Sequence, residues 1–112
     1  MGADEILRAL KAVAEPTRLR VLELLLGWEG PRTGPVRSEE RGLCLCDLEL
    51  LVGLPHALVC HHLRILKEAG VVESEKRGRW TVYRACPEPL ASIARRLAGL
   101  AAPRSGHDSR AA

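Results

Sequence analysis

The sequence predicts a mainly helical (α+β) fold with one small β-hairpin. Apolar residues at helical spacing predict a short helix over about 46–52 and a longer helix over about 55–69, with a tight turn at Gly53 between them. Two strand-like segments, 71–74 and 80–85, follow and enclose a basic turn. A short helix, a tight turn and a longer helix form a helix-turn-helix, and a hairpin directly after it is a wing. The predicted fold is therefore a winged helix-turn-helix.

Further helices flank this unit. Amphipathic patterns predict them over about residues 4–13, 17–26 and 88–100. Pro16 suits the first turn of the second of these helices, because its missing N–H costs nothing there. Residues 27–42 are rich in glycine and proline and predict a flexible inserted loop. This loop exceeds the usual helix–helix connection of about 2–8 residues.

Length and composition indicate a single small domain. We expect the 112 residues to form one winged helix-turn-helix domain over 1–102 for DNA binding and dimerisation, followed by a disordered tail over 103–112. A hydrophobic content of 46% argues against general disorder. The net charge of +3 is compatible with DNA binding, and a helical homodimer would bury more apolar surface than a lone domain this small.

The four cysteines are interpreted from the expected compartment. The sequence holds no apolar run of the roughly 20 residues that a membrane span needs, and its first residues are acidic and lack a signal-peptide core. We therefore expect a cytoplasmic protein without membrane contact, in which cysteines act as ligands, sensors or core residues more often than as structural disulfides. Cys44 and Cys46 lie one residue apart at the start of the predicted helix-turn-helix, and thiolates capture soft metal and metalloid ions.

Four stretches of the chain together resemble the ArsR/SmtB family of winged-helix metal-sensing repressors. They are EPTRL (15–19), LCLCDL (43–48), HLRILKEAGVV (62–72) and GRWTVYR (78–84). The cysteine box resembles the arsenic-responsive branch and its cadmium and lead relatives. The resemblance implies a homodimeric repressor that binds double-stranded operator DNA and releases it when As(III) or Sb(III) binds Cys44 and Cys46. Such a repressor would control an arsenic-resistance operon.

Two positions depart from the family pattern. Glu49 stands where the arsenic box often has a third cysteine, and Cys60 stands where the recognition helix often has serine. The third ligand could be Cys60, Cys86, a small cellular thiol or hydroxide, and we favour an exogenous ligand because no third sulfur is local. Residues i and i+2 do not face each other on a helix. Chelation should therefore oppose a helical start at the cysteines, and we hypothesise that it unwinds or bends the first turn of the 46–52 helix and displaces the 55–69 helix.

The predicted DNA-reading surface consists of the 55–69 helix and the wing. The helix should enter the major groove with its N-terminal part nearest the bases. We expect base-edge contacts from His56, Cys60 and His61. Phosphate or rim contacts are expected from Arg64 and Lys67 on the helix. The wing residues Lys76, Arg77 and Arg79 should reach the DNA backbone or the minor groove, and Tyr83 could add a hydrogen bond to a phosphate. His62 lies on the inner apolar stripe of the 55–69 helix, so we expect it to pack between helices.

The pattern of the last predicted helix indicates a dimer interface instead of a second metal site. Over 88–100 it contains no histidine and Glu88 as its single carboxylate, which makes a zinc site there improbable. Its apolar stripe should pack with the first helix of the chain across a two-fold axis. The expected interface residues are Ile6, Leu10, Leu90, Ile93, Leu97 and Leu100.

The sequence leaves other interpretations of the cysteine pair open. The same fold could sense Cd(II), Pb(II) or thiol oxidation, although a disulfide between Cys44 and Cys46 would close a small, strained ring. Both could also be small buried hydrophobic residues, as free cysteines often are. A reading of another class is a small dithiol redox or metalloid-modifying enzyme, but no nucleophile–base arrangement or paired catalytic carboxylates are evident. A structural zinc protein would need four well-spaced ligands.

Overall fold

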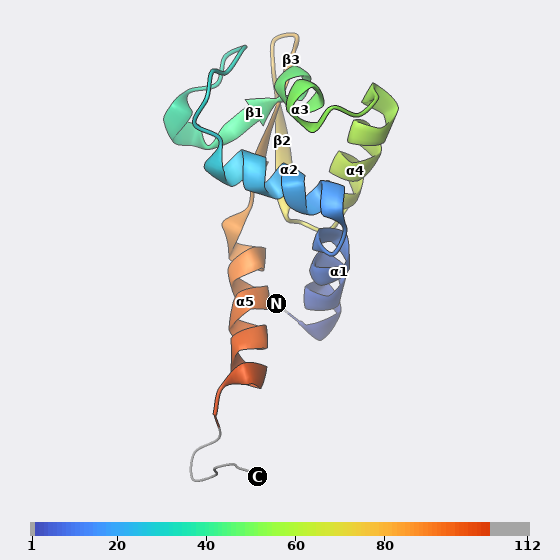
Figure 1. The fold of residues 1–112 in the computed structure, drawn as a ribbon, viewed down its shortest axis with the longest axis vertical. Coiled ribbons are helices and arrows are strands. Elements are labelled where there is room, and N and C mark those ends of the chain that lie inside the picture. The colour runs from blue at the N-terminus through green and yellow to red at the C-terminus, as the bar shows by residue number, and fades with distance from the viewer. Residues whose placement is uncertain (1, 104–112) are drawn as a thin grey trace.

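The computed structural model describes residues 2–103, and Figure 1 shows a helical molecule built around a small sheet. Its elements are α1 (Ala3–Val13), α2 (Pro16–Gly27), the 3₁₀ turn η1 (Ser38–Glu40), β1 (Gly42–Cys44), α3 (Leu45–Val52), α4 (His56–Glu68), β2 (Val72–Arg77), β3 (Trp80–Ala85) and α5 (Pro87–Ala101). The predicted winged helix-turn-helix is confirmed, with α3 and α4 as the two helices and β2–β3 as the wing. The predicted disordered tail, apart from Pro103, lies outside the described residues.

The sheet contains a strand that the sequence did not predict. Its order is β1-β3-β2 with antiparallel pairing throughout, and Cys44 lies opposite Val82 of β3. The sequence predicts a loop up to residue 42 and no helix or strand at residues 43 and 44. A strand of three residues has no measurable alternation, and β1 forms because β3 offers it a free edge. The first wing strand also runs longer than predicted, to Arg77 instead of residue 74.

The core lies where α2, α3 and α4 meet the sheet. Leu25, Leu48, Leu63 and Leu66 are fully buried there. Since these leucines come from α2 and from both helices of the helix-turn-helix, the same apolar cluster fixes the angle between α3 and α4. Figure 1 shows α5 running away from the sheet on the same side as α1, which it contacts.

Polar contacts tie the start of α2 to α4. Pro16 occupies the first turn of α2 as predicted, and the carboxylate of Glu15 accepts the backbone N–H of Arg18. The Arg18 side chain donates to the carbonyl of Ala12 (2.6 Å) and lies 3.1 Å from Nδ1 of His62. His62 therefore lies between helices, as its position on the inner stripe predicted.

Candidate metalloid site and DNA-reading surface

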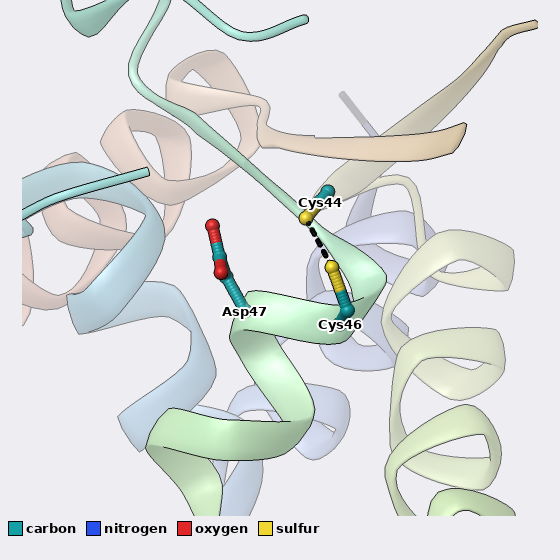
Figure 2. A group of neighbouring side chains, drawn as sticks. All are labelled: Cys44, Cys46 and Asp47. Carbon is teal, nitrogen blue, oxygen red and sulfur yellow. Dashed lines mark hydrogen bonds between the residues drawn. The ribbon is translucent and has the colours of Figure 1, made fainter. Parts of the chain in front are cut away.

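The two sulfurs of the cysteine pair already lie together in the structure. Cys44 is the last residue of β1 and the N-cap of α3. Since α3 begins at Leu45, Cys46 is the second residue of that helix. Because Cys44 has extended backbone angles (φ −75°, ψ 161°), its side chain turns toward Cys46, and the two Sγ atoms are 2.8 Å apart. Figure 2 shows them facing each other. Cys44 is buried and Cys46 is exposed, so the pair opens to solvent on one side.

This geometry removes the premise of the unwinding hypothesis. The two cysteines would have been unable to share an ion only if both lay in regular helix, and α3 begins between them, at Leu45. For metal–sulfur bonds of about 2.3 Å and bond angles of roughly 90–110°, two bound sulfurs lie roughly 3.3–3.8 Å apart. Chelation thus requires the sulfurs to separate by about 0.5–1 Å, and loss of the first helical turn is not needed.

Thr33, in the long loop, closes one side of the dithiol. Its backbone N–H and its hydroxyl both donate to the carboxylate of Asp47, at 2.8 and 2.9 Å. The Thr33 hydroxyl oxygen lies 3.3 Å from the sulfur of Cys44 and 3.4 Å from that of Cys46. Asp47 is buried, and its carboxylate lies within 4.8 Å of both sulfurs. Thr33 lies in the 27–42 segment, for which the sequence predicts only a flexible loop, and no local pattern indicates this contact.

Burial sets the protonation of the inner cysteine. It raises the pKa of the Cys44 thiol above its usual value, and the adjacent Cys46 thiol adds to the rise. The hydroxyl of Thr33 lowers the pKa of Cys44 and so opposes these effects. Cys44 is consequently a protonated thiol at neutral pH.

Replacing Thr33 with valine is expected to raise the pKa of Cys44 further. Thr33→Val removes the hydroxyl that stabilises the thiolate but keeps the backbone N–H bond to Asp47. Titration of thiolate ultraviolet absorbance, in protein with Cys60 and Cys86 replaced by serine, measures the shift. Thr81→Val is the matched control.

Thr81 lines the same hollow as the dithiol, and it is not among the groups that shift the pKa of Cys44. An unchanged or lowered thiol pKa in Thr33→Val would show that the Thr33 hydroxyl does not stabilise the thiolate.

The dithiol opens into a hollow of about 330 Å³ that reaches both DNA-reading elements. Cys44 and Cys46 form one part of its wall, His56 of α4 another, and Arg79 and Trp80 at the wing tip a third. The guanidinium of Arg79 lies 5.4 Å from the centre of the Trp80 ring, a cation–π contact. An ion at the dithiol would therefore lie close to the start of the recognition helix and to the wing.

Cys60 and Cys86, the two candidate protein residues for the third ligand, lie away from the Cys44–Cys46 pair. Cys60 joins a separate group with Glu49 and His56, in which the possible ligand atoms are within 4.8 Å of one another. Cys86 lies between β3 and α5, and its backbone N–H donates to the carbonyl of Val71. Burial raises the pKa of the Cys86 thiol. Among the described residues, neither of these cysteines belongs to the group formed by Cys44, Cys46 and Asp47.

The predicted contact residues of α4 share an accessible face. His56, His61, Arg64 and Lys67 are exposed, and Cys60 is half-buried among them. His61 and Arg64 lie 3.3 Å apart, and the ammonium of Lys67 donates to Ser74 of β2. These contacts are solvent-facing, so the side chains can exchange them for contacts to DNA.

Arg77 differs from its neighbours in the wing. Lys76 and Arg79 are exposed, whereas Arg77 donates to Glu40 (2.6 Å), to Glu75 (3.0 Å) and to the carbonyl of Pro35 (2.7 Å). Its guanidinium lowers the pKa of Glu40 to about 2. Arg77, predicted to reach the DNA backbone or the minor groove, is thus engaged within the molecule, where it ties the 27–42 segment to the wing.

Tyr83, another predicted phosphate contact, is half-buried in β3 and packs against the core. Burial raises the pKa of its hydroxyl. Tyr83 lies opposite Leu43 in β1 and Ser74 in β2, so its backbone is fixed within the sheet. Its role toward DNA stays a prediction.

The predicted dimer residues line an apolar groove of about 220 Å³ between α1 and α5. Its wall includes Ile6, Leu10, Ile93, Leu97 and Leu100. Leu97 is 48% and Leu100 81% exposed, while Ile93 is buried within the protomer. Leu90 packs against the core at the other end of α5. No helix of the described residues is long and apolar enough to cross a membrane.

The chain matches known transcriptional regulators in sequence. The model of the family "Bacterial regulatory protein, arsR family" matches residues 38–74, from η1 into β2. An uncharacterized HTH-type transcriptional regulator of Methanocaldococcus jannaschii is 36% identical over 73 residues, which cover 65% of this chain and 68% of that protein.

Several relatives carry names that refer to a metal or a metalloid, among them the following two. The arsenical resistance operon repressor of Escherichia coli is 31% identical over 81 residues, 72% of this chain and 59% of that protein. A cadmium resistance regulatory protein homolog of Staphylococcus aureus is 28% identical over 79 residues, 70% of this chain and 55% of that protein. The chain therefore spans little more than half the length of these two relatives.

Solved structures agree with the fold. A crystal structure of a possible transcriptional regulator for arsenical resistance has a TM-score of 0.65 and 27% identity and covers 85% of both chains. The homodimeric winged helix-turn-helix DNA-binding domain of a Mycobacterium bovis protein has a TM-score of 0.63 at 21% identity, over 96% of this chain and 88% of that chain. The chain belongs to the arsR family of bacterial regulatory proteins, and it is a winged helix-turn-helix transcriptional regulator and not an enzyme.

Proposed function

We propose that this protein is a homodimeric repressor that leaves its operator when As(III) or Sb(III) binds Cys44 and Cys46. The observation that carries the proposal is the pair of sulfurs 2.8 Å apart, open to solvent at the first residues of the helix-turn-helix. Soft sulfur donors select soft ions, and a pair at this distance chelates with little rearrangement. The names of the E. coli and S. aureus relatives make a resistance operon for a soft metal or metalloid the natural target.

Arsenite can condense with two thiols without releasing a proton. Each S–H condenses with one hydroxyl of As(OH)₃, an As–S bond replaces an As–O bond, and one water leaves for each sulfur. The product keeps one hydroxide on arsenic, which a small cellular thiol can replace. This supports an exogenous third ligand, because Cys60 and Cys86 both lie outside the group that contains the pair.

Dimerisation and DNA binding complete the proposal. Exposed Leu97 and Leu100 on α5, beside Leu7 on α1, leave an apolar face that a second copy would cover. The M. bovis domain with the same fold is homodimeric, which supports this assignment. A two-fold dimer would present two α4 helices to half-sites about one DNA turn, or a multiple, apart.

The direct test is operator release. Fluorescence anisotropy of labelled DNA from just upstream of the gene, titrated with the protein, gives the affinity. Arsenite, antimonite, Cd(II), Pb(II), Zn(II) and peroxide are then added in turn. The proposal requires arsenite or antimonite to weaken binding. Tight arsenite binding with unchanged operator affinity would contradict it.

The pH dependence of binding separates arsenite from cadmium, the alternative that the S. aureus relative supports. Cd(II) must displace a proton from each thiol, so its affinity should rise up to about tenfold per pH unit for each proton released. The raised pKa of Cys44 extends this rise above neutral pH. Arsenite binding releases water and no net proton, so its affinity should stay flat below the thiol pKa.

Isothermal titration in two buffers of different ionisation enthalpy, repeated across pH, counts the protons released. A steep pH dependence for arsenite would contradict binding by this condensation. Cadmium affinity that does not change with pH would contradict the release of protons when Cd(II) binds.

A further inference from the structure

We propose that Glu49, His56 and Cys60 form a second metal site, distinct from the dithiol, that takes a borderline divalent ion such as Zn(II). This site does not depend on the arsenic proposal, and it concerns residues at the N-terminal end of the recognition helix. Nitrogen, sulfur and carboxylate oxygen are the ligands that Zn(II) uses in proteins. All three donor types come together here, with possible ligand atoms within 4.8 Å of one another.

The spacing of the Cys60 sulfur and the His56 imidazole fits one tetrahedral ion. The sulfur of Cys60 lies 3.5 Å from Nε2 and 3.9 Å from Nδ1 of His56. For a Zn–S bond of about 2.3 Å and a Zn–N bond of about 2.05 Å, a tetrahedral angle places S and N about 3.6 Å apart. The carboxylate of Glu49 contacts Nδ1 of His56 directly. A water molecule would complete the four ligands, because His56 is 68% exposed.

The fold brings these residues together across the turn of the helix-turn-helix. Glu49 lies on α3, and His56 and Cys60 lie one turn apart on the same face of α4. Gly53 permits the turn, since its φ of 75° is in the left-handed region that favours glycine. An ion held by all three residues would bridge α3 to α4.

The donor sets of the two sites predict different ion preferences. The dithiol offers two sulfurs, which suit a metalloid with high affinity for sulfur. The second site offers one sulfur, one nitrogen and one carboxylate, which suit Zn(II) or its spectroscopic substitute Co(II). The sequence departures at positions 49 and 60, which left the arsenic ligand set incomplete, supply two of the three donors here.

A metal at this site would change DNA binding directly. His56 and Cys60 are two of the three predicted base-edge contacts, and an ion would occupy both. We therefore expect Zn(II) to lower operator affinity through these residues, even when the dithiol is absent.

The test uses Co(II) and the full-length chain in which Cys44 and Cys46 are serine. A thiolate-to-cobalt charge-transfer band should appear at one equivalent per protomer. Adding Cys60→Ser should abolish the band, and His56→Ala should weaken Co(II) binding by more than about tenfold. If the double serine variant fails to fold, Cys46→Ser alone serves as the background, because Cys46 is exposed and a single remaining thiol cannot chelate.

Cys86→Ser is the matched control, because Cys86 lies outside both groups and should leave the band unchanged. If the variant with serine at positions 44 and 46 keeps its fold but shows no Co(II) band, the proposal is wrong and the ion belongs to the dithiol. A band that survives Cys60→Ser would also overturn it. Arsenite-induced release in the Cys60→Ser variant tests the dithiol independently, so failure of one proposal leaves the other measurable.

Discussion

Cys46→Ser is expected to abolish arsenite-induced release of the operator while leaving operator affinity in the absence of arsenite unchanged. A single thiolate cannot chelate, so the free energy that links the ion to the DNA reader is lost. Typical coupling of about 1–3 kcal/mol corresponds to roughly 5–150-fold weaker DNA binding in the wild type, and the variant should show none of this change. Anisotropy titrations of operator DNA with and without arsenite measure the ratio.

Cys46 is the better of the two positions for this experiment. It is exposed, whereas Cys44 is buried in the core, where serine would replace an apolar thiol with a more polar hydroxyl. Cys86→Ser is the control for loss of a thiol and should release DNA normally. Undiminished release in Cys46→Ser would assign sensing to other residues and leave the dithiol without a role.

Removing the two exposed cations of the wing is the second change with a large expected effect. Lys76→Ala with Arg79→Ala should weaken binding to all DNA sequences alike if these cations lie against the DNA backbone, because phosphate contacts carry no sequence information. Each lost phosphate contact should reduce the slope of log affinity against log salt by about 1. Affinity measured at several salt concentrations, on operator and on random DNA, provides both quantities.

Arg95→Ala is the matched control for this experiment. Arg95 is an exposed cation on α5, paired with Glu88 and far along the chain from the wing. If the double variant and the control show the same salt slope, the two wing cations do not contact DNA phosphates. Arg77→Ala should lower the salt slope less than the loss of Lys76 or of Arg79. The reason is that the guanidinium of Arg77 is held by Glu40 and Glu75.

The elements of the fold with strong periodicity were predictable from the sequence. Each helix carries an apolar stripe long enough to identify, and the wing has two strand-like segments around a glycine turn. β1 was missed because a three-residue strand exists only through pairing with β3, and residues 42–44 contain no sign of that partner.

The cysteine pair was also recognisable in the sequence, because its spacing is local. The groups around it were not, since their partners are distant in the chain. Thr33 is 14 residues from Asp47, and the Arg77–Pro35 contact spans 42 residues. Placing His56 against Glu49 requires the angle between α3 and α4, which is set by the core leucines and by no pattern near either residue.

The pairing of Cys44 with Val82 bears on how a signal could reach the DNA. Cys44 belongs to the same ladder as β3, which begins at the wing tip, and Cys46 belongs to the helix that precedes α4. When the sulfurs separate, one moves with the wing and the other with the helix-turn-helix. The ion would thus act at the joint between the two DNA-contacting parts, and no relay through the rest of the protein is required. Changes in α1 or α5 should consequently alter the stability of a dimer while the response of each protomer to arsenite persists.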